Sequence, residues 1–252
     1  MQSGIGEALL AAAFACVAFL YSIAGQAGGT GYIAVMGLAG FSAVTIKPVA
    51  LILNILVAAI GCVNFYRAGL LTWRSCYPFA ILGIPFSILG GKINLPEAVY
   101  QPVVGLLLLL AALQMVRSAR TAEQDDRRAP VHPPFLAGLL AGGALGFISG
   151  VTGVGGGIFL APLVLTMAWA ASRQTAAIAA TFNLFNSASA LTGVWATVVS
   201  LPPSLPLWLA AVGLGGIAGS WLSIRFIKPA VLRILLGVLL ATAGIRMIAK
   251  FF

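Results

Sequence analysis

Long runs of apolar residues, separated by short polar turns, make up most of this chain. They lack the alternation of apolar and polar residues that marks strands, and many approach the ~20 residues that a helix needs to cross a bilayer. The predicted spans lie at 5–24, 48–66, 98–116, 135–152, 175–199, 207–224 and 230–250. Because only helices and closed barrels satisfy the backbone in lipid, we expect an all-α polytopic membrane protein.

Two glycine-rich stretches, 25–31 and 153–157, interrupt the apolar runs. Each glycine inside a helix costs roughly 1 kcal/mol relative to alanine, so no helix is expected to run through either stretch. The apolar segments that follow, 32–45 and 158–171, would rise only ~21 Å as helices. Because the hydrocarbon core is ~30 Å thick, we expect these segments to be half-helices.

A third short segment, 76–91, is expected to be broken by Pro85, because a proline inside a helix removes a hydrogen bond and kinks it. The only long polar run, 117–134, is interpreted as a linker. It separates a first repeat at 1–116 from a second repeat at 135–252. Each repeat would hold a glycine-broken helix pair and three spans, which gives 8–10 segments in all, depending on how the broken pairs are counted.

The two halves can be aligned at a constant shift of 132 residues. The matched pairs are Asn54 with Asn186, Gly61 with Gly193, Gly83 with Gly215, Gly105 with Gly237, and Met115 with Met247. Both halves also contain one glycine-rich break, although the breaks align only with a gap of about four residues. We therefore expect an internal repeat.

The composition excludes a water-soluble fold. Only 8% of the 252 residues are charged and 61% are hydrophobic, and the mean hydropathy is +1.07. A soluble domain carries roughly 25% charged residues. The three cysteines are far apart in the sequence, so neither a metal site nor a redox pair is expected.

The formal net charge of +9 is interpreted as a topology signal rather than a nucleic-acid site, because the basic residues are scattered between the spans. With five segments per half, one side receives Arg67, Arg74, Arg117, Arg120, Arg127, Arg128, Arg173, Arg225 and Lys228. The other side receives Lys47, Lys92 and Lys250. This bias predicts a cytoplasmic linker and periplasmic termini, and an odd number of crossings per half would give inverted repeats.

The glycine breaks are the first candidate for chemistry. A helix that begins after a break directs its free N–H groups and the positive end of its dipole towards the neighbouring space, which suits an anion. The candidate substrate-binding residues here are Gly28, Gly29, Thr30, Gly31, Gly155, Gly156 and Gly157. Close helix packing through small residues also uses glycine, and this alternative stays open.

Polar residues in the spans after the breaks are the second candidate: Asn54, Asn183, Asn186 and Ser187. Asn183 and Asn186 are three residues apart and share a helix face. These side chains could donate hydrogen bonds to a small oxyanion, or they could cross-link helices. The acids lie near span ends or in the linker, and no metal cluster or nucleophile–base pair is evident. We therefore expect no metal, no cofactor and no enzymatic activity.

The run GVTGVGGGIFLAPLVL, followed by a span containing TFNLFNS, resembles the sulfite exporter TauE/SafE family. The likeness covers nearly the whole chain. In the first half AGQAGGTGYIAVMGL is a divergent copy, in which Met36 or a neighbour stands where the second half has Pro162. The resemblance implies a membrane permease of bacteria or archaea that moves small sulfur-containing anions such as sulfite, sulfoacetate or other organosulfonates.

Taken together, these features predict a transporter of the bacterial inner membrane with a midplane anion site between two repeats and an alternating-access mechanism. A passive anion channel and a non-transporting membrane scaffold are the alternatives. The expected partners are a small anion and the lipid bilayer, without nucleic acid, and the lipid-facing surfaces would allow a homo-oligomer.

Overall fold

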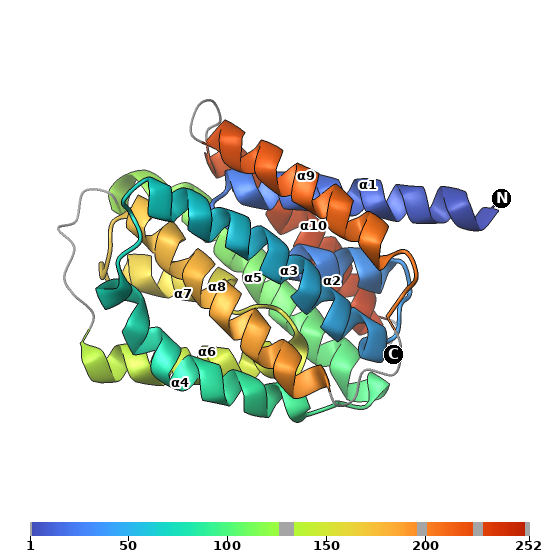
Figure 1. Ribbon diagram of the computed structural model, residues 1–252, viewed down its shortest axis with the longest axis horizontal. Helices are drawn as coiled ribbons and strands as arrows, with labels where there is room; N and C mark the ends of the chain where they lie inside the picture. The colour runs from blue at the N-terminus through green and yellow to red at the C-terminus, as the bar shows by residue number, and fades with distance from the viewer. Residues whose placement is uncertain (1, 126–133, 196–200, 224–228, 250–252) are drawn as a thin grey trace.

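The computed structural model describes residues 2–125, 134–195, 201–223 and 229–249, and the regular secondary structure in these ranges is all helical (Figure 1). In chain order the helices are α1 (Gln2–Ile23), α2 (Gly29–Leu38), α3 (Ala43–Arg67), α4 (Trp73–Lys92), α5 (Glu97–Asp125), α6 (Phe135–Thr152), α7 (Gly157–Thr166), α8 (Ser172–Val194), α9 (Leu205–Ser223) and α10 (Pro229–Ala249). The predicted all-α class is therefore confirmed.

Within the described residues five helices, namely α1, α3, α5, α6 and α9, are long and apolar enough to cross a bilayer. In contrast, α2 and α7 have 10 residues each. At ~1.5 Å per residue each rises ~15 Å, about half the thickness of the hydrocarbon core. The two segments expected to be half-helices are therefore short. α7 begins at Gly157, the last glycine of its break, and α2 begins at Gly29, two residues before the last glycine of its break.

Two expectations about element ends are wrong. Pro85 does not break its segment, because α4 is one continuous helix of 20 residues with Pro78 and Pro85 inside it. α4 packs along both α6 and α8, and neighbouring helices can hold a proline-containing membrane helix together. The run predicted as a linker also begins within a helix, since α5 continues to Asp125. Residues 126–133 of that run lie outside the described residues.

Helices of the first half pack against helices of the second half in a reciprocal pattern. When α1–α5 are matched in order with α6–α10, α4 packs on α6 as α9 packs on α1. Likewise α4 packs on α8 as α9 packs on α3, and α2 packs on α10 as α7 packs on α5. The matched helices α3 and α8 contact each other, as do α5 and α10. Such exchange of partners is what a two-fold relation produces.

The contact between α5 and α10 also gives their relative direction. A Cβ atom built on Gly105 would lie 2.9 Å from the Gly244 carbonyl oxygen, and one built on Gly237 would lie 3.3 Å from the Ala112 carbonyl oxygen. Residue numbers therefore rise along α5 as they fall along α10, so the two helices are antiparallel. At the shift of 132 these two contacts exchange with each other.

The other matched pair that packs together, α3 and α8, is antiparallel as well. Asn54 lies opposite Ser187, and Cys62 lies opposite Thr181. In Figure 1 the two short helices, α2 and α7, lie towards opposite ends of the long axis of the molecule. The antiparallel direction of both matched pairs and the separate positions of the short helices are thus both consistent with a two-fold relation between the halves.

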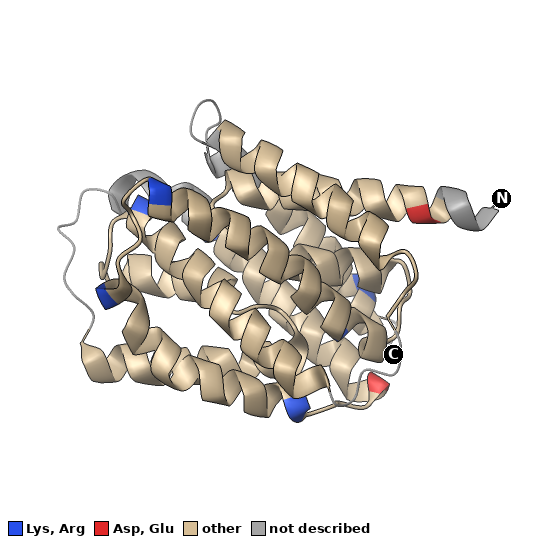
Figure 2. Ribbon diagram, viewed as in Figure 1, with Lys and Arg blue, Asp and Glu red and all other residues tan. Residues whose placement is uncertain are grey.

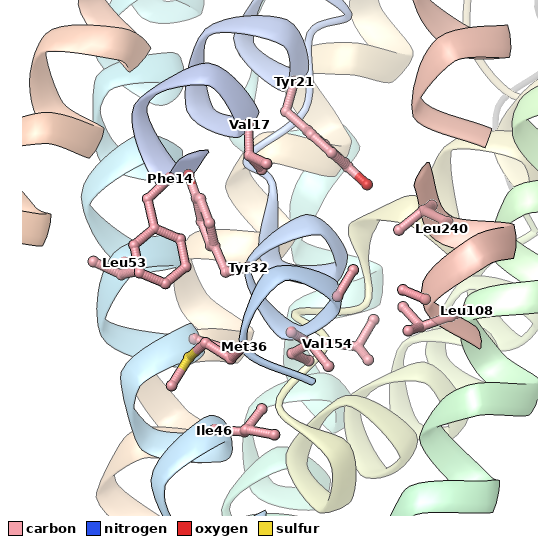
Figure 3. Close-up of a cluster of buried hydrophobic side chains, with 14 of the residues drawn as sticks. Phe14, Val17, Tyr21, Tyr32, Met36, Ile46, Leu53, Leu108, Val154 and Leu240 are labelled. Carbon is pink, nitrogen blue, oxygen red and sulfur yellow. The ribbon is translucent and has the colours of Figure 1, made fainter. Parts of the chain in front are cut away.

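Buried apolar side chains surround α2 (Figure 3). Phe14 of α1 meets the rings of Tyr32 and Trp208 edge-on, with centroid distances of 6.0 and 5.2 Å. A smaller cluster, which includes Phe79 and Phe182, contacts α7. The short helices are therefore enclosed by protein, which lets the interrupted backbone beside them exist at membrane depth.

Charged side chains are sparse along the helices (Figure 2). Arg67 lies at the end of α3, and Lys92 lies at the end of α4. The expectation that Lys47 lies in a loop is wrong, because it is part of α3 and its side chain is only 4% exposed. The helix begins at Ala43, five residues before Pro48, and Pro48 lies inside it.

We predict that two glycines on α9 respond differently to alanine. A Cβ atom on Gly215 would lie 2.3 Å from the Ala15 carbonyl oxygen of α1, whereas one on Gly213 would lie 3.6 Å from the end of the Leu56 side chain. Gly215→Ala must push α1 away and should destabilise the protein by about 1–3 kcal/mol. Gly213→Ala should leave stability unchanged or raise it, since alanine favours a helix. Thermal unfolding of both variants in detergent measures the difference, and equal melting temperatures would contradict this packing.

Candidate functional site

The two glycine breaks meet where α3 crosses α8. A Cβ atom built on Gly29 would lie 2.5 Å from the Val154 carbonyl oxygen and 3.1 Å from Asn54 Oδ1. One built on Gly155 would lie 2.4 Å from Asn54 Nδ2 and 2.9 Å from Asn183 Oδ1. Any side chain at either glycine would separate the breaks. The glycines therefore bring backbone from both halves against the amide of Asn54.

Backbone conformation also requires glycine in both breaks. Gly28 has a φ of 97°, and Gly155 and Gly156 have φ values of 89° and 77°. This left-handed region costs other L-residues roughly 1–2 kcal/mol. Gly28 and Gly156 are the residues from which α2 and α7 begin, and neither helix has a side-chain cap from that residue.

Asn183 accepts a hydrogen bond from the first backbone N–H of α7. The backbone N–H of Gly157 donates a hydrogen bond of 2.8 Å to Asn183 Oδ1. The beginning of α2 differs, because no described residue accepts a hydrogen bond from the N–H groups of Gly29, Thr30 or Gly31. These N–H groups carry the partial positive charge of about +0.5 that a helix N-terminus presents. The two half-helices are therefore unequal, and α2 has free donors.

Three further hydrogen bonds lie around the crossing of α3 and α8. Asn54 Nδ2 donates to Ser187 Oγ at 2.8 Å, and Asn186 Nδ2 donates to the Gly155 carbonyl oxygen at 3.3 Å. Ser87 Oγ donates to the Asn186 carbonyl oxygen at 2.7 Å. Asn54, Asn183, Asn186 and Ser187 are each at most 4% exposed, so the site is closed in this conformation.

Two side-chain oxygens of the site have no hydrogen-bond partner. They are Oδ1 of Asn54 and Oδ1 of Asn186, which occupy corresponding positions in the two halves. A buried polar atom without a partner costs about 1–3 kcal/mol, and each of these two oxygens can still accept a hydrogen bond. The Asn186 amide is fixed in direction, because a backbone carbonyl such as that of Gly155 can only accept. Asn54 can turn its amide over, since the Ser187 hydroxyl can either donate or accept.

The structure does not bring all the predicted site residues to this crossing. A Cβ atom on Gly28 would lie 3.0 Å from the Tyr32 ring, and one on Gly31 would lie 2.5 Å from Val17 of α1. Thr30 Oγ1 bonds to the Tyr21 hydroxyl at 2.8 Å. The backbone N–H groups of Thr30 and Gly31 belong to the first turn of α2. The Thr30 side chain and the Cα of Gly31, however, contact α1. Gly156 and Gly157 do face the site, against Asn186 and Asn183.

Sequence reasoning missed three neighbours of the site, which are Tyr21, Ser87 and Ser149. Ser149 lies in α6 with its hydroxyl buried and unpartnered, and its Cβ is 3.3 Å from a Cβ atom built on Gly156. All three lie in predicted spans or short segments, where a lone hydroxyl is weak evidence for a site. A glycine alignment cannot identify them, because their roles depend on which helices pack together.

A family model described as sulfite exporter TauE/SafE matches residues 9–247. The chain belongs to the sulfite exporter TauE/SafE family. The expected resemblance is thus confirmed, and the protein is a multi-pass membrane transporter, a class of transport protein rather than an enzyme. The bilayer and a small substrate follow as partners of this TauE/SafE transporter.

Two relatives carry the same kind of name. The probable membrane transporter protein y4hK of Sinorhizobium fredii (strain NBRC 101917 / NGR234) is 48% identical over 239 residues, which cover 95% of this chain and 97% of the relative. The probable membrane transporter protein MJ0441 of Methanocaldococcus jannaschii is 27% identical over 109 residues, or 42% of this chain and 39% of the relative. No solved structure matches this TauE/SafE chain.

We predict that Gly155→Ala impairs the protein more than Gly40→Ala. Both glycines have similar φ values, 89° and 82°, so alanine suffers similar backbone strain at both positions. Only the Cβ at position 155 meets other atoms, since nothing lies within 4 Å of a Cβ at position 40. The Gly155 variant should have the lower melting temperature and the lower transport rate in vesicles. Equal losses in the two variants would contradict the close contact with Asn54.

Proposed function

We propose that this protein transports a small sulfur-containing anion, such as sulfite, sulfoacetate or another organosulfonate. The binding site lies near the membrane midplane between the two halves. The observation that carries this proposal is the start of α2, where the N–H groups of Gly29, Thr30 and Gly31 have no described acceptor and Gly29 lies against the amide of Asn54. The family supports the class of substrate.

Neutral hydrogen-bond donors suit a substrate that the protein must both bind and release. Hydrogen bonds from N–H groups to an anion are charge-assisted and stronger than neutral ones. Asn54 can turn its Nδ2 towards the beginning of α2 while Ser187 donates to its Oδ1. The anion would then be bound by backbone N–H groups and one amide, without a full positive charge in direct contact. Such a site binds the anion selectively and still releases it.

An alternating-access mechanism is supported by the closed site. The side chains of Asn54, Asn183, Asn186 and Ser187 are buried, so an anion can enter only after helices separate on one side. We propose that the two halves are inverted repeats about an axis in the membrane plane. The antiparallel matched pairs α3–α8 and α5–α10, and their reciprocal neighbours, support this relation.

The proposed orientation has the linker at 117–134 in the cytoplasm and both termini in the periplasm of a bacterial inner membrane. The excess of arginine predicted from the sequence for the side of the linker supports it. A thiol reagent that cannot cross the membrane should label a cysteine introduced in the linker only after cells are opened. Labelling in intact cells would contradict this orientation.

Flux into proteoliposomes tests the function. Sulfite, sulfoacetate and taurine are supplied outside vesicles that contain the purified protein, and the initial rates are measured over a range of concentrations. We expect saturable uptake of at least one sulfur-containing anion. A flux that never saturates would indicate a passive channel instead. Absence of both flux and anion-induced thermal stabilisation would indicate a scaffold.

We predict that Asn54→Leu reduces saturable uptake at least about tenfold, because leucine fills the space of the amide without its N–H groups. Asn64→Leu is the matched control, since Asn64 lies on the same helix but is partly exposed and away from the crossing. The control should transport normally. Normal uptake by the Asn54 variant would contradict the site. Melting temperatures of both variants establish that each is folded.

A further inference from the structure

A buried lysine stands beside the second glycine break. Lys47 is 4% exposed, and its Nζ donates to three carbonyl oxygens, those of Gly90 at 3.4 Å, Gly91 at 2.9 Å and Ile93 at 2.8 Å. These carbonyls lie at the end of α4. The ammonium group thereby joins α3 to α4, and all three of its protons are directed to carbonyl oxygens.

The charge of Lys47 has no carboxylate partner among the described residues. Glu97, which is near this end of the molecule, accepts instead from the Ala43 backbone N–H at 2.9 Å and from Gln101 at 2.7 Å. The end of α4 offers a partial negative charge of about −0.5, which balances only part of a full positive charge. The acceptors of this buried ammonium group are therefore backbone carbonyls and not a carboxylate.

The location of this charge links it to the site. Lys47 and Asn54 are two turns apart on one face of α3, a rise of ~10 Å. The Cα of Lys47 is 3.2 Å from a Cβ atom built on Gly153, where the second break begins. At the shift of 132 the corresponding residue is Ala179, so the other half has no lysine at this position. A buried cation thus lies on one side of the site, and the corresponding position in the other half has none.

We propose that Lys47 is both a gate and the first anion-binding residue on its side of the transporter. In the closed conformation its ammonium group holds the end of α4. When α3 and α4 separate on that side, the three N–H donors leave the carbonyls of Gly90, Gly91 and Ile93 and bind the incoming anion. The anion then moves inward along α3 to Asn54. This proposal rests on the anion transport proposed above.

Exchange of partners makes this gate reversible. The same three donors are satisfied by carbonyl oxygens when closed and by anion oxygens when open, so no state leaves the charge without acceptors. Electrostatic attraction in a low-dielectric opening raises the local concentration of anion. The positive charge also opposes entry of cations. Lys47 would therefore determine the apparent affinity for the anion on one side of the membrane.

Lys47→Gln tests this role, because glutamine retains donors for the carbonyls of α4 but has no charge. The measurement is the KM and the maximal rate of sulfite uptake in proteoliposomes at low and high salt. We expect the KM to rise at least about tenfold and to depend less on salt than in the unmodified protein. Lys47→Arg should keep the KM close to its original value. Lys92→Gln is the matched control, since Lys92 is an exposed lysine at the same end of α4.

The outcomes separate this role from a purely structural one. An unchanged KM and salt dependence in Lys47→Gln, with only a lower melting temperature, would overturn the proposal and leave Lys47 as a helix cap. Should Lys47→Gln fail to fold, the unmodified protein gives the test, because a KM for sulfite that does not depend on salt would overturn the proposal. An unmodified protein without saturable anion flux would contradict the proposed function itself. Saturable flux whose KM and salt dependence stay the same when Lys47 is replaced would contradict only the role of Lys47.

Discussion

Direct contact between backbone segments of the two halves is the constraint on which the rest of the structure depends. The carbonyl of Val154 lies so close to Gly29 that no side chain fits between them. Asn54 is held against both breaks at the same point. The breaks stop α1 and α6, force α2 and α7 to be short, and leave N–H donors at the centre of a molecule whose other interior surfaces are largely apolar. Without the glycines, these donors would be paired within longer helices.

The two breaks are alike in sequence but unequal in their hydrogen bonds. Asn183 accepts from the first N–H of α7, whereas the N–H groups that begin α2 have no described acceptor. The residue that corresponds to Asn183 at the shift of 132 is Leu51, which has no polar atom in its side chain. Both halves thus contain a broken helix, and the first N–H of α7 has an acceptor whereas the first N–H of α2 has none among the described residues. The buried charge of Lys47 adds a second difference between the halves.

Much of the centre could be predicted from the sequence, because it depends on local properties. Glycine clusters oppose helix formation wherever they occur, so the breaks and the starts of the half-helices were predictable. Asn54, Asn183 and Asn186 were predictable candidates, since an amide in an apolar span needs a partner. The continuity of α4 through Pro85 was not predictable, because it depends on α6 and α8 packed beside it.

The position of Lys47 shows why other features could not be predicted. A lysine near a predicted loop is normally a topology signal, and only the nearby end of α4 makes its burial acceptable. The same holds for the bond between Tyr21 and Thr30, which requires α1 and α2 to fold back on each other. These features depend on contacts between segments that are distant in the sequence. Such contacts cannot be predicted from helix propensity or from the charge pattern.

Crystallography with selenite tests the central claim most directly. Selenite has the shape and charge of sulfite, and selenium can be located by its anomalous scattering. We predict one main selenium peak between the beginning of α2 and Asn54, in contact with the N–H groups near Gly29. A main peak beside α7 at Gly157, or selenium only on the outer surface of a protein that transports sulfite, would contradict a site formed where the two breaks meet.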